Sequence, residues 1–309
     1  MLVLGARGFA GGHLVPAARE AGFDVVTASR AEGEADVRCE LLDPGSVEDA
    51  LVKSAPDAVV NVAGAASVAW SWSDPAGALS VNGIGTLNLL EGVARRAPEA
   101  HVTCVSSAEV YGAVSEDDLP VSEDAPVRPL NPYGTTKASM ELICGQYARG
   151  GLGVAVMRSF NHLGPGQSDA FAVSNFARQI ADAEAAGAGE LELKTGDLSP
   201  VRDFTDVRDV VRAYVVAARE GLAGIFNVCS GNGVGLEAVV GLLNDRTALP
   251  VRVGVDQSRL RPTEAPRVWG SSERLRDATG WAPEIPLERT LDDLLGWWRG
   301  RVGSATRES

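Results

Sequence analysis

The chain has 309 residues, 45% of them hydrophobic, and its 28 Lys and Arg against 41 Asp and Glu give a formal net charge of −13. That length and apolar content suit one large or two modest globular domains, while the negative charge argues against a nucleic acid or an anionic membrane as partner. The apolar runs are too short to span a bilayer and no basic leader precedes them, so we expect a cytoplasmic protein.

A glycine-rich turn follows the first predicted strand. Residues 2–4 are typical of a short buried strand, and a G-x-x-G-x-x-G spacing follows them before an apolar helix that ends near residue 22. The first N–H groups of a helix can bind a pyrophosphate, and glycine lets the backbone approach it without a Cβ atom. The flanking strand and helix favour dinucleotide binding over a plain tight turn. The cofactor contacts expected here are Gly5, Arg7, Gly8, Phe9 and Gly11.

The end of the second predicted strand indicates which dinucleotide binds. Residues 23–28 form this strand, and Ser29 and Arg30 follow it where NAD enzymes usually have an acidic residue for the ribose hydroxyls. An arginine accommodates a 2′-phosphate instead, so we expect NADP(H) rather than NAD(H), with Arg7 assisting Arg30. The alternative is that Arg30 is an ordinary loop arginine. A third strand is expected to end at residues 41–43, with Asp43 near the adenine.

Strands and helices continue to alternate up to residue 159. Strands are expected at residues 58–62, 101–106 and 153–159, with a helix at 79–96 between the first two. This alternation predicts an α/β fold with a doubly wound parallel sheet of the Rossmann type. Ligands bind at the carboxyl ends of such strands. The residues there include Ala63 and Ser67 after the first of these strands, and Ser107, Ala108 and Glu109 after the second.

A tyrosine and a lysine lie one helical turn apart in the next segment. Asn131 suits the N-cap of a helix and Pro132 its first position, and Tyr133 and Lys137 then share one face. A free tyrosine has a pKa of about 10, which a nearby cation lowers, so the pair can serve as a general acid and base. Taken alone, the Y-x-x-x-K spacing also fits an ordinary exposed helix.

The composition changes after residue 162, where glycine and proline mark a break. We therefore assign residues 1–162 to an NADP-binding Rossmann domain and 163–309 to a smaller α/β domain that binds the substrate. Helices are expected at 172–185 and 207–219, and the strand expected at 224–228 would return to the main sheet, so that 203–230 belongs with the first domain.

The order of these motifs resembles the extended short-chain dehydrogenase/reductases that act on nucleotide sugars. The motifs that carry the resemblance are Gly5/Gly8/Gly11, Ser106-Ser107, Tyr133 with Lys137, Arg158-Ser159-Phe160-Asn161 and Arg202-Asp203-Phe204. The second half is similar to the branch of that family that acts on GDP-mannose and its 4-keto-6-deoxy derivative. Residues 159–168, 202–211 and 261–264 carry that closer similarity.

The resemblance implies a role for each site residue. Tyr133 would be the acid/base, and Lys137 would hold the nicotinamide ribose and lower the pKa of Tyr133. Ser107 would hydrogen-bond to the reacting oxygen. The implied substrate contacts are Ser67, Ser107, Ala108, Asn161, Arg202, Arg261 and Glu264. Arginine suits a pyrophosphate, although surface ion pairing with Asp203 or Glu264 is the alternative for Arg202 and Arg261.

Three reactions share this core. A reductase would use NADPH to reduce the C4 keto group of a GDP-4-keto-6-deoxyhexose to a product of the GDP-rhamnose type, and we favour this reaction. A GDP-mannose 4,6-dehydratase would use Glu109 as the base near C5, but Ala108 replaces the hydroxyl or carboxyl usual in dehydratases. An epimerase acting at C4 of a nucleotide sugar would generally retain NAD, which Arg30 disfavours.

Two further expectations concern partners and metals. The alternative from another class is a non-catalytic nucleotide sensor on the same fold, and the intact set of Ser107, Tyr133 and Lys137 argues against it. The family resemblance implies a homodimer formed through the helices at 79–96 and 133–149. Four cysteines without C-x-x-C spacing indicate free thiols, and three scattered histidines indicate that no metal is bound.

Overall fold

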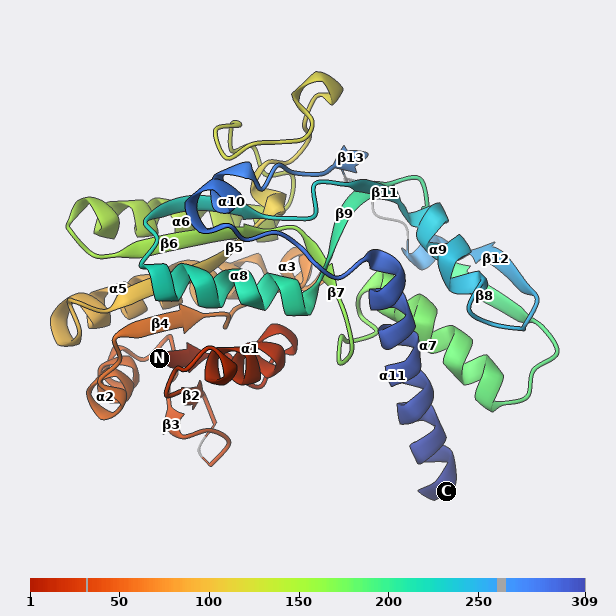
Figure 1. Ribbon diagram of the computed structural model, residues 1–309, viewed down its shortest axis with the longest axis horizontal. Helices are drawn as coiled ribbons and strands as arrows, with labels where there is room; N and C mark the ends of the chain where they lie inside the picture. The colour runs from red at the N-terminus through yellow and green to blue at the C-terminus, as the bar shows by residue number, and fades with distance from the viewer. Residues whose placement is uncertain (32, 260–264, 309) are drawn as a thin grey trace.

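Seven parallel strands form the central sheet (Figure 1). The computed structural model describes residues 1–31, 33–259 and 265–308. The strands of this sheet are β1 (Leu2–Leu4), β2 (Val26–Ser29), β3 (Val37–Arg38), β4 (Ala58–Asn61), β5 (His101–Ser107), β6 (Val154–Ser159) and β10 (Gly224–Val228). Their spatial order is β10-β6-β5-β4-β1-β2-β3, the Rossmann order with one further strand beside β6. The predicted fold class is confirmed.

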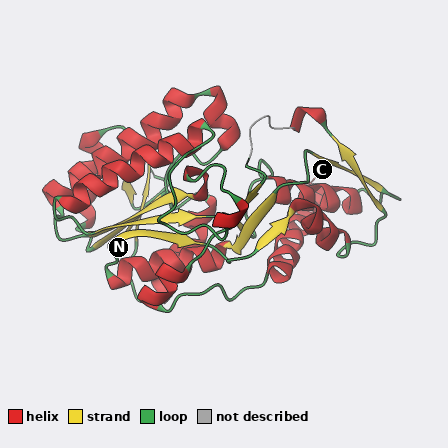
Figure 2. Cartoon of the chain, turned by 90° about the horizontal axis from the view of Figure 1, so that it is seen from above, coloured by secondary structure: helices red, strands yellow, loops and turns green. Residues whose placement is uncertain are grey.

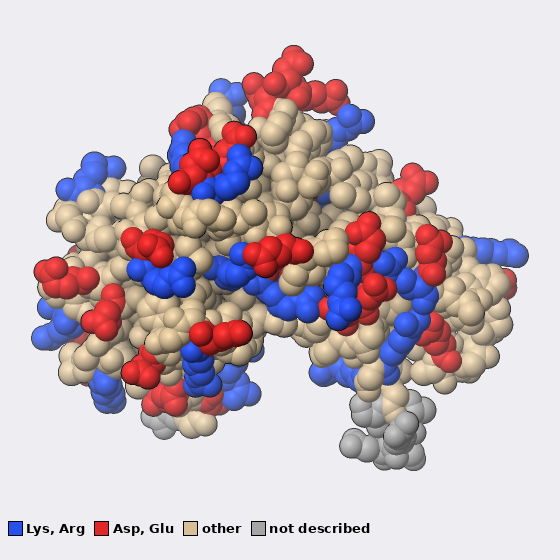
Figure 3. All heavy atoms as spheres, viewed as in Figure 1, with Lys and Arg blue, Asp and Glu red and all other residues tan. Residues whose placement is uncertain are grey.

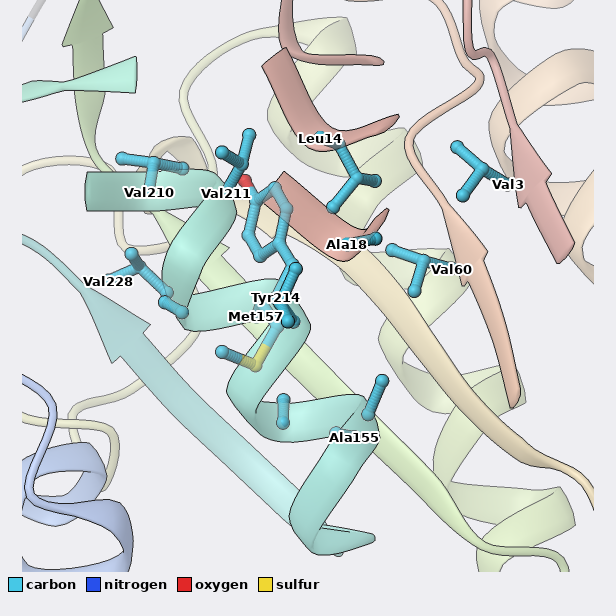
Figure 4. Packing of buried hydrophobic residues seen from close by; sticks show 14 of the residues in the cluster. Val3, Leu14, Ala18, Val60, Ala155, Met157, Val210, Val211, Tyr214 and Val228 are labelled. Atoms are coloured by element: carbon cyan, nitrogen blue, oxygen red, sulfur yellow. The ribbon is translucent and has the colours of Figure 1, made fainter. Parts of the chain in front are cut away.

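Helices cover both faces of the sheet. One face packs against α1 (Phe9–Glu20) and α8 (Val207–Glu220), and the other against α2 (Pro44–Ser54), α5 (Gly85–Arg96) and α6 (Pro132–Arg149). Figure 4 shows the first interface, in which Val3, Val60 and Met157 of the strands meet side chains of these two helices. Leu2 and Leu4 point to the other face. Burial on both faces explains why the strands are almost continuously apolar.

A smaller group of elements lies at one end of the molecule (Figures 1 and 2). Its strands are β7 (Asn161–Leu163), β8 (Leu191–Thr195), β9 (Val201–Asp206), β11 (Gly233–Gly235), β12 (Val251–Val255) and β13 (Arg267–Val268). Its helices are α7 (Ala172–Ala185), α9 (Leu236–Asn244) and α11 (Leu287–Glu308). β9 pairs with β7, β11 and β13, while β8 pairs with β12. A separate apolar core lies between α7, α9 and α11.

The remaining short elements lie mostly in loops. They are α3 (Val68–Ser73), α4 (Pro75–Leu79), a π-helix (Ser80–Ile84), α10 (Glu273–Thr279) and three 3-10 turns (Ala108–Val110, Glu116–Asp118 and Gln257–Arg259). The helix expected from residue 79 therefore starts earlier and contains a π turn. Within the described part of the chain, no helix combines the length and apolar character needed to cross a membrane.

The predicted third strand is wrong. Residues 41–43 are not a strand, because β3 is Val37–Arg38 and Asp43 is the N-cap of α2. The Asp43 carboxylate accepts hydrogen bonds from the backbone N–H groups of Gly45 and Ser46, at 3.0 and 3.2 Å. An Asp-Pro pair is a strong helix-start signal, and here it outweighs the two preceding leucines.

Charged side chains of both signs are mixed over the face seen in Figure 3. Basic side chains of the chain also pair with acidic ones, as Arg208 does with Asp206 and Asp293, at 2.7 and 2.8 Å. That face therefore has no broad basic surface of the kind that attracts a nucleic acid.

A buried ion pair joins α6 to the central sheet. Arg158 of β6 donates two hydrogen bonds to the Glu141 carboxylate, at 2.9 and 2.7 Å, and both residues are buried. Arg158 also donates to the Tyr111 hydroxyl at 3.0 Å, and Ser106 of β5 donates to Glu141 at 2.6 Å. Because Glu141 follows Lys137 by one turn of α6, this pair fixes the helix that carries Tyr133 and Lys137.

We predict that Arg158→Met lowers the free energy of unfolding by about 3–5 kcal/mol, because it leaves the Glu141 carboxylate buried without its cation. Chemical denaturation of the variant and the parent protein measures the change. Arg252→Met is the control: its ion pair with Glu190 spans 3.7 Å and its side chain is 81% exposed, so the loss should be about 1 kcal/mol or less. Equal losses in the two variants would contradict the prediction.

Candidate active site

The carboxyl ends of β1, β4 and β5 and the N-terminus of α6 meet at one edge of the sheet. Leu4 lies beside Asn61, which lies beside Cys104, so β5 runs three residues further and carries Ser107 beyond its neighbours. This edge is where parallel α/β sheets bind their ligands. The turn after β1, the loop after β4 and the turn after β5 therefore surround one site.

The N-terminus of α6 is fixed by three hydrogen bonds. Asn131 caps the helix as predicted, since its Oδ1 accepts from the backbone N–H of Gly134 at 2.8 Å, and its Nδ2 donates to Glu109 Oε2 at 2.7 Å. The backbone N–H of Tyr133 donates to Ser71 Oγ at 3.0 Å. A Cβ atom on Gly134 would lie 2.5 Å from the Glu109 carbonyl oxygen, so glycine is required where the helix touches the turn after β5.

Tyr133, Lys137 and Ser107 come together as predicted. The Ser107 hydroxyl lies close enough to the Tyr133 phenol to lower its pKa. The Lys137 ammonium lies 5.9 Å from the centre of the Tyr133 ring and donates to the Val105 carbonyl oxygen at 2.8 Å. An ammonium has three N–H donors, so this bond leaves Lys137 able to hold a further polar group while its charge stays beside the ring.

The pKa of Tyr133 moves opposite to the prediction. Burial raises it to about 12, more than the hydrogen bond from Ser107 lowers it, and the nearby Glu109 carboxylate raises it further. Burial also lowers the pKa of Lys137 to about 8. The spacing of Tyr133 and Lys137 predicts a nearby cation but does not reveal desolvation, which dominates the pKa of Tyr133 in this site. Tyr133 is therefore protonated at neutral pH and able to donate a proton.

The glycine turn has the close packing expected of a pyrophosphate site. Gly5 has a φ of +81°, and a Cβ atom on it would lie 2.7 Å from the backbone nitrogen of Ala63. A Cβ atom on Gly11 would lie 2.1 Å from the Gly5 carbonyl oxygen. Gly8 is the N-cap of α1 and has no side chain to bind the first N–H groups of that helix. These features fit a dinucleotide phosphate at the N-terminus of α1.

The residues expected near a 2′-phosphate lie at the end of β2. Ser29 ends this strand, and exposed Arg30 follows it. Arg7 reaches the same region from the turn after β1, where its Nε lies 3.6 Å from the Glu34 carboxylate. Asp43 is exposed at the start of α2, and any contact with the adenine stays a prediction beside its capping role.

The predicted substrate residues differ from one another in their exposure and in their local hydrogen bonds. Ser67 caps α3 through a 3.1 Å bond from the backbone N–H of Trp70, and Ala108 begins the turn after β5. Asn161 is exposed at the start of β7, whereas Arg202 is nearly buried and donates to the Val201 carbonyl oxygen at 2.8 Å. Arg261 and Glu264 lie outside the described residues. Substrate contacts by all six stay predictions.

Asn82 is a site residue to which the sequence argument assigned no role. It lies in the π-helix, where its Oδ1 accepts from the backbone N–H of Ala65 at 2.9 Å and its Nδ2 donates to Thr136 Oγ1 at 2.8 Å. A Cβ atom on Gly64 would lie 2.7 Å from Asn82 Oδ1 and 3.7 Å from Lys137 Nζ. Asn82 thus fixes the loop after β4 beside Lys137. The signal available in the sequence was an asparagine between apolar residues of the helix expected at 79–96.

An aromatic stack links the glycine turn to the smaller group of elements. The rings of Phe9 and His162 are nearly parallel, with 5.8 Å between their centres. His13, also on α1, forms a 2.8 Å hydrogen bond with the Pro165 carbonyl oxygen. Phe9 was expected to contact the cofactor, and its observed packing places the cofactor turn directly against the loop after β7.

Among the described residues, no three His, Cys, Asp or Glu side chains are arranged to hold a metal.

Comparisons with known proteins agree with this geometry. The chain is 40% identical to the GDP-6-deoxy-D-mannose reductase of Pseudomonas aeruginosa, over 86% of this chain and 87% of that protein. It is 29% identical to the UDP-glucose 4-epimerase of Azospirillum brasilense (99% and 97% covered) and 27% identical to the GDP-mannose 4,6-dehydratase of Yersinia enterocolitica (83% and 76% covered).

A solved structure and a family model complete the comparison. The structure of RMD from Pseudomonas aeruginosa, complexed with NADPH, superposes with a TM-score of 0.87 at 38% identity, covering 97% of this chain and 99% of that one. The model of the NAD dependent epimerase/dehydratase family matches residues 1–229. The family resemblance of the sequence motifs is thereby confirmed, and the chain belongs to the NAD dependent epimerase/dehydratase family.

Proposed function

We propose that this protein is an NADPH-dependent reductase that converts the C4 keto group of a GDP-4-keto-6-deoxyhexose to a hydroxyl. The observation that carries the proposal is the 40% identity to a GDP-6-deoxy-D-mannose reductase, against 29% and 27% to the epimerase and the dehydratase. The Tyr133 hydroxyl, close to Ser107 in the site, can serve as the proton donor that reduction requires.

Each site residue has a separate role in the reaction. When bound, NADPH supplies the hydride for C4. Tyr133 donates a proton to the C4 oxygen, and Ser107 donates a hydrogen bond to that oxygen as negative charge develops on it. The backbone N–H of Glu109 donates to Ser107 Oγ at 3.2 Å, which orients the hydroxyl. Lys137 supplies the positive charge beside the phenolate that remains.

A GDP-mannose 4,6-dehydratase is the second candidate, because the Glu109 carboxylate lies near the Tyr133 phenol. One oxygen of its carboxylate accepts the hydrogen bond from Asn131 at 2.7 Å, so the residue already supports the N-cap of α6. Ala108 brings no hydroxyl or carboxyl to extend a proton path toward C6. Both observations favour the reductase.

We propose a homodimer that forms through α5, α6 and the π-helix. Leu142 of α6 is 77% exposed, and Ile84 and Leu87 are also exposed on neighbouring, contacting elements. Apolar side chains grouped on the outer surface of two packed helices fit a self-complementary interface.

We expect purified protein under anaerobic conditions to oxidise NADPH when given GDP-4-keto-6-deoxy-mannose and to leave GDP-mannose unchanged. Absorbance of the reduced nicotinamide and chromatography of the sugar nucleotide measure the two reactions. A keto product from GDP-mannose, without net change in NADPH, would instead establish the dehydratase and assign the base to Glu109.

Tyr133→Phe should lower the turnover number by about 10²–10⁴-fold, because the proton donor is removed. NADPH binding, measured by fluorescence, should persist. Tyr147→Phe is the matched control: it makes the same change on α6, where the hydroxyl donates to Glu91 at 2.7 Å, and turnover should be unchanged. Full activity of Tyr133→Phe would remove Tyr133 from the mechanism.

Leu142→Glu should convert the dimer to a monomer at micromolar concentration, because it places a charge in an apolar interface. Light scattering gives the mass. Val52→Glu on α2, where valine is 63% exposed, is the control that should stay dimeric. A parent protein with the mass of one chain would refute the proposed dimer.

A further inference from the structure

Glu34 contacts Arg7 and Ser29, two of the residues expected near a 2′-phosphate. Its Oε2 is 3.6 Å from Arg7 Nε and accepts a hydrogen bond from Ser29 Oγ at 3.4 Å. Its backbone carbonyl oxygen accepts from Arg7 Nη1 at 3.4 Å. A carboxylate thus occupies the space between the guanidinium of the glycine turn and the hydroxyl at the end of β2.

This space coincides with the expected cofactor subsite. β1 and β2 are adjacent parallel strands, with Leu4 beside Ala28, so the residues that follow them lie at the same edge of the sheet. In dinucleotide-binding sheets, the end of the second strand is where the 2′ position of the adenosine ribose binds. A carboxylate and a phosphate are both anions that accept hydrogen bonds from arginine and serine.

We propose that Glu34 is an internal anion that occupies the 2′-phosphate subsite in the cofactor-free protein and leaves when NADP(H) binds. This inference rests on the proposed use of NADP(H). Glu34 is then a specificity-determining residue, because it competes with the 2′-phosphate and does not compete with a cofactor that lacks one.

The contacts of Glu34 are weak enough to be displaced. Its side chain is 47% exposed and that of Arg7 is 61% exposed, so solvent screens the ion pair. A phosphate carries about −1.5 to −2 charges at neutral pH, against one on the carboxylate, and offers three acceptor oxygens. The 2′-phosphate therefore binds Arg7 more strongly than Glu34 does.

The loop that carries Glu34 is bonded to β2 two residues after Glu34. Asp36 accepts hydrogen bonds from the backbone N–H and the hydroxyl of Thr27, at 2.8 and 2.7 Å, and these bonds tie the loop to β2. Glu34 can thus swing away from Arg7 without separating the loop from the sheet. The fixed anchor keeps the displaced carboxylate close to the subsite.

Glu34→Gln should tighten NADPH binding by about 2- to 5-fold, the range that corresponds to an exposed ion pair. Titration of nicotinamide fluorescence gives the dissociation constants for NADPH and for NADH, and that for NADH should be unchanged. Glu20→Gln is the matched control, because it removes the same charge from an exposed residue at the end of α1. Its dissociation constants should equal those of the parent protein.

A double-mutant cycle tests whether the competition acts through Arg7. Arg7→Gln should weaken NADPH binding, and adding Glu34→Gln in that background should have a smaller effect than in the parent protein. An unchanged NADPH constant in Glu34→Gln would overturn the inference while leaving the proposed reductase intact. Weaker NADH binding in Glu34→Gln would overturn it by making Glu34 a ligand of the ribose hydroxyls. A parent protein that binds NADH and not NADPH would overturn both the inference and the proposed cofactor.

Discussion

The buried pair of Arg158 and Glu141 is the interaction on which the position of the catalytic helix depends. Both side chains are removed from water, and each satisfies the other through two hydrogen bonds. Ser106 and Tyr111 add bonds from β5 and the loop after it. Since a buried charge without a partner is costly, α6 has one favourable position on the sheet. Because Lys137 lies one turn before Glu141 on α6, the same ion pair also fixes the position of Lys137.

Desolvation controls the chemistry that this position allows. A tyrosine in water beside a lysine would lose its proton more easily, but here burial raises the pKa of Tyr133 and lowers that of Lys137. The protein therefore presents a proton donor next to a cation whose charge is costly to bury. Ser107 offsets part of the penalty by bonding to the phenol. A protonated phenol in this position can donate its proton to an alkoxide that develops on the substrate.

The two groups of elements meet directly at the cofactor turn. Phe9 stacks on His162, and His13 bonds to the Pro165 carbonyl oxygen, so the helix that would bind the pyrophosphate touches the loop that leads into the smaller group. α8 and β10 then lead the chain back to the central sheet, where β10 pairs with β6. Packing of the smaller group is thereby coupled to the region where the dinucleotide would bind.

Local signals in the sequence determined the helix starts and the spacing of the site residues. The helix start at Asn131-Pro132, the spacing of Tyr133 and Lys137, and the glycine spacing after β1 are set by neighbouring residues, and the structure confirms each. The helix Ala172–Ala185 also has its predicted bounds, because its apolar period is a local property. The Asp-Pro cap at Asp43 was equally local, and the preceding leucines obscured it.

Only the tertiary structure decided the properties that depend on burial and on distant partners. The direction of the Tyr133 pKa depends on how much of the chain surrounds the phenol, which spacing does not reveal. The bonds from Asn82 to Thr136 and from Asn131 to Glu109 join residues whose side chains meet only after folding. The sequence thus determined which groups the site contains, and the fold determined their charge states and contacts, because desolvation and hydrogen-bond geometry arise only when the elements pack.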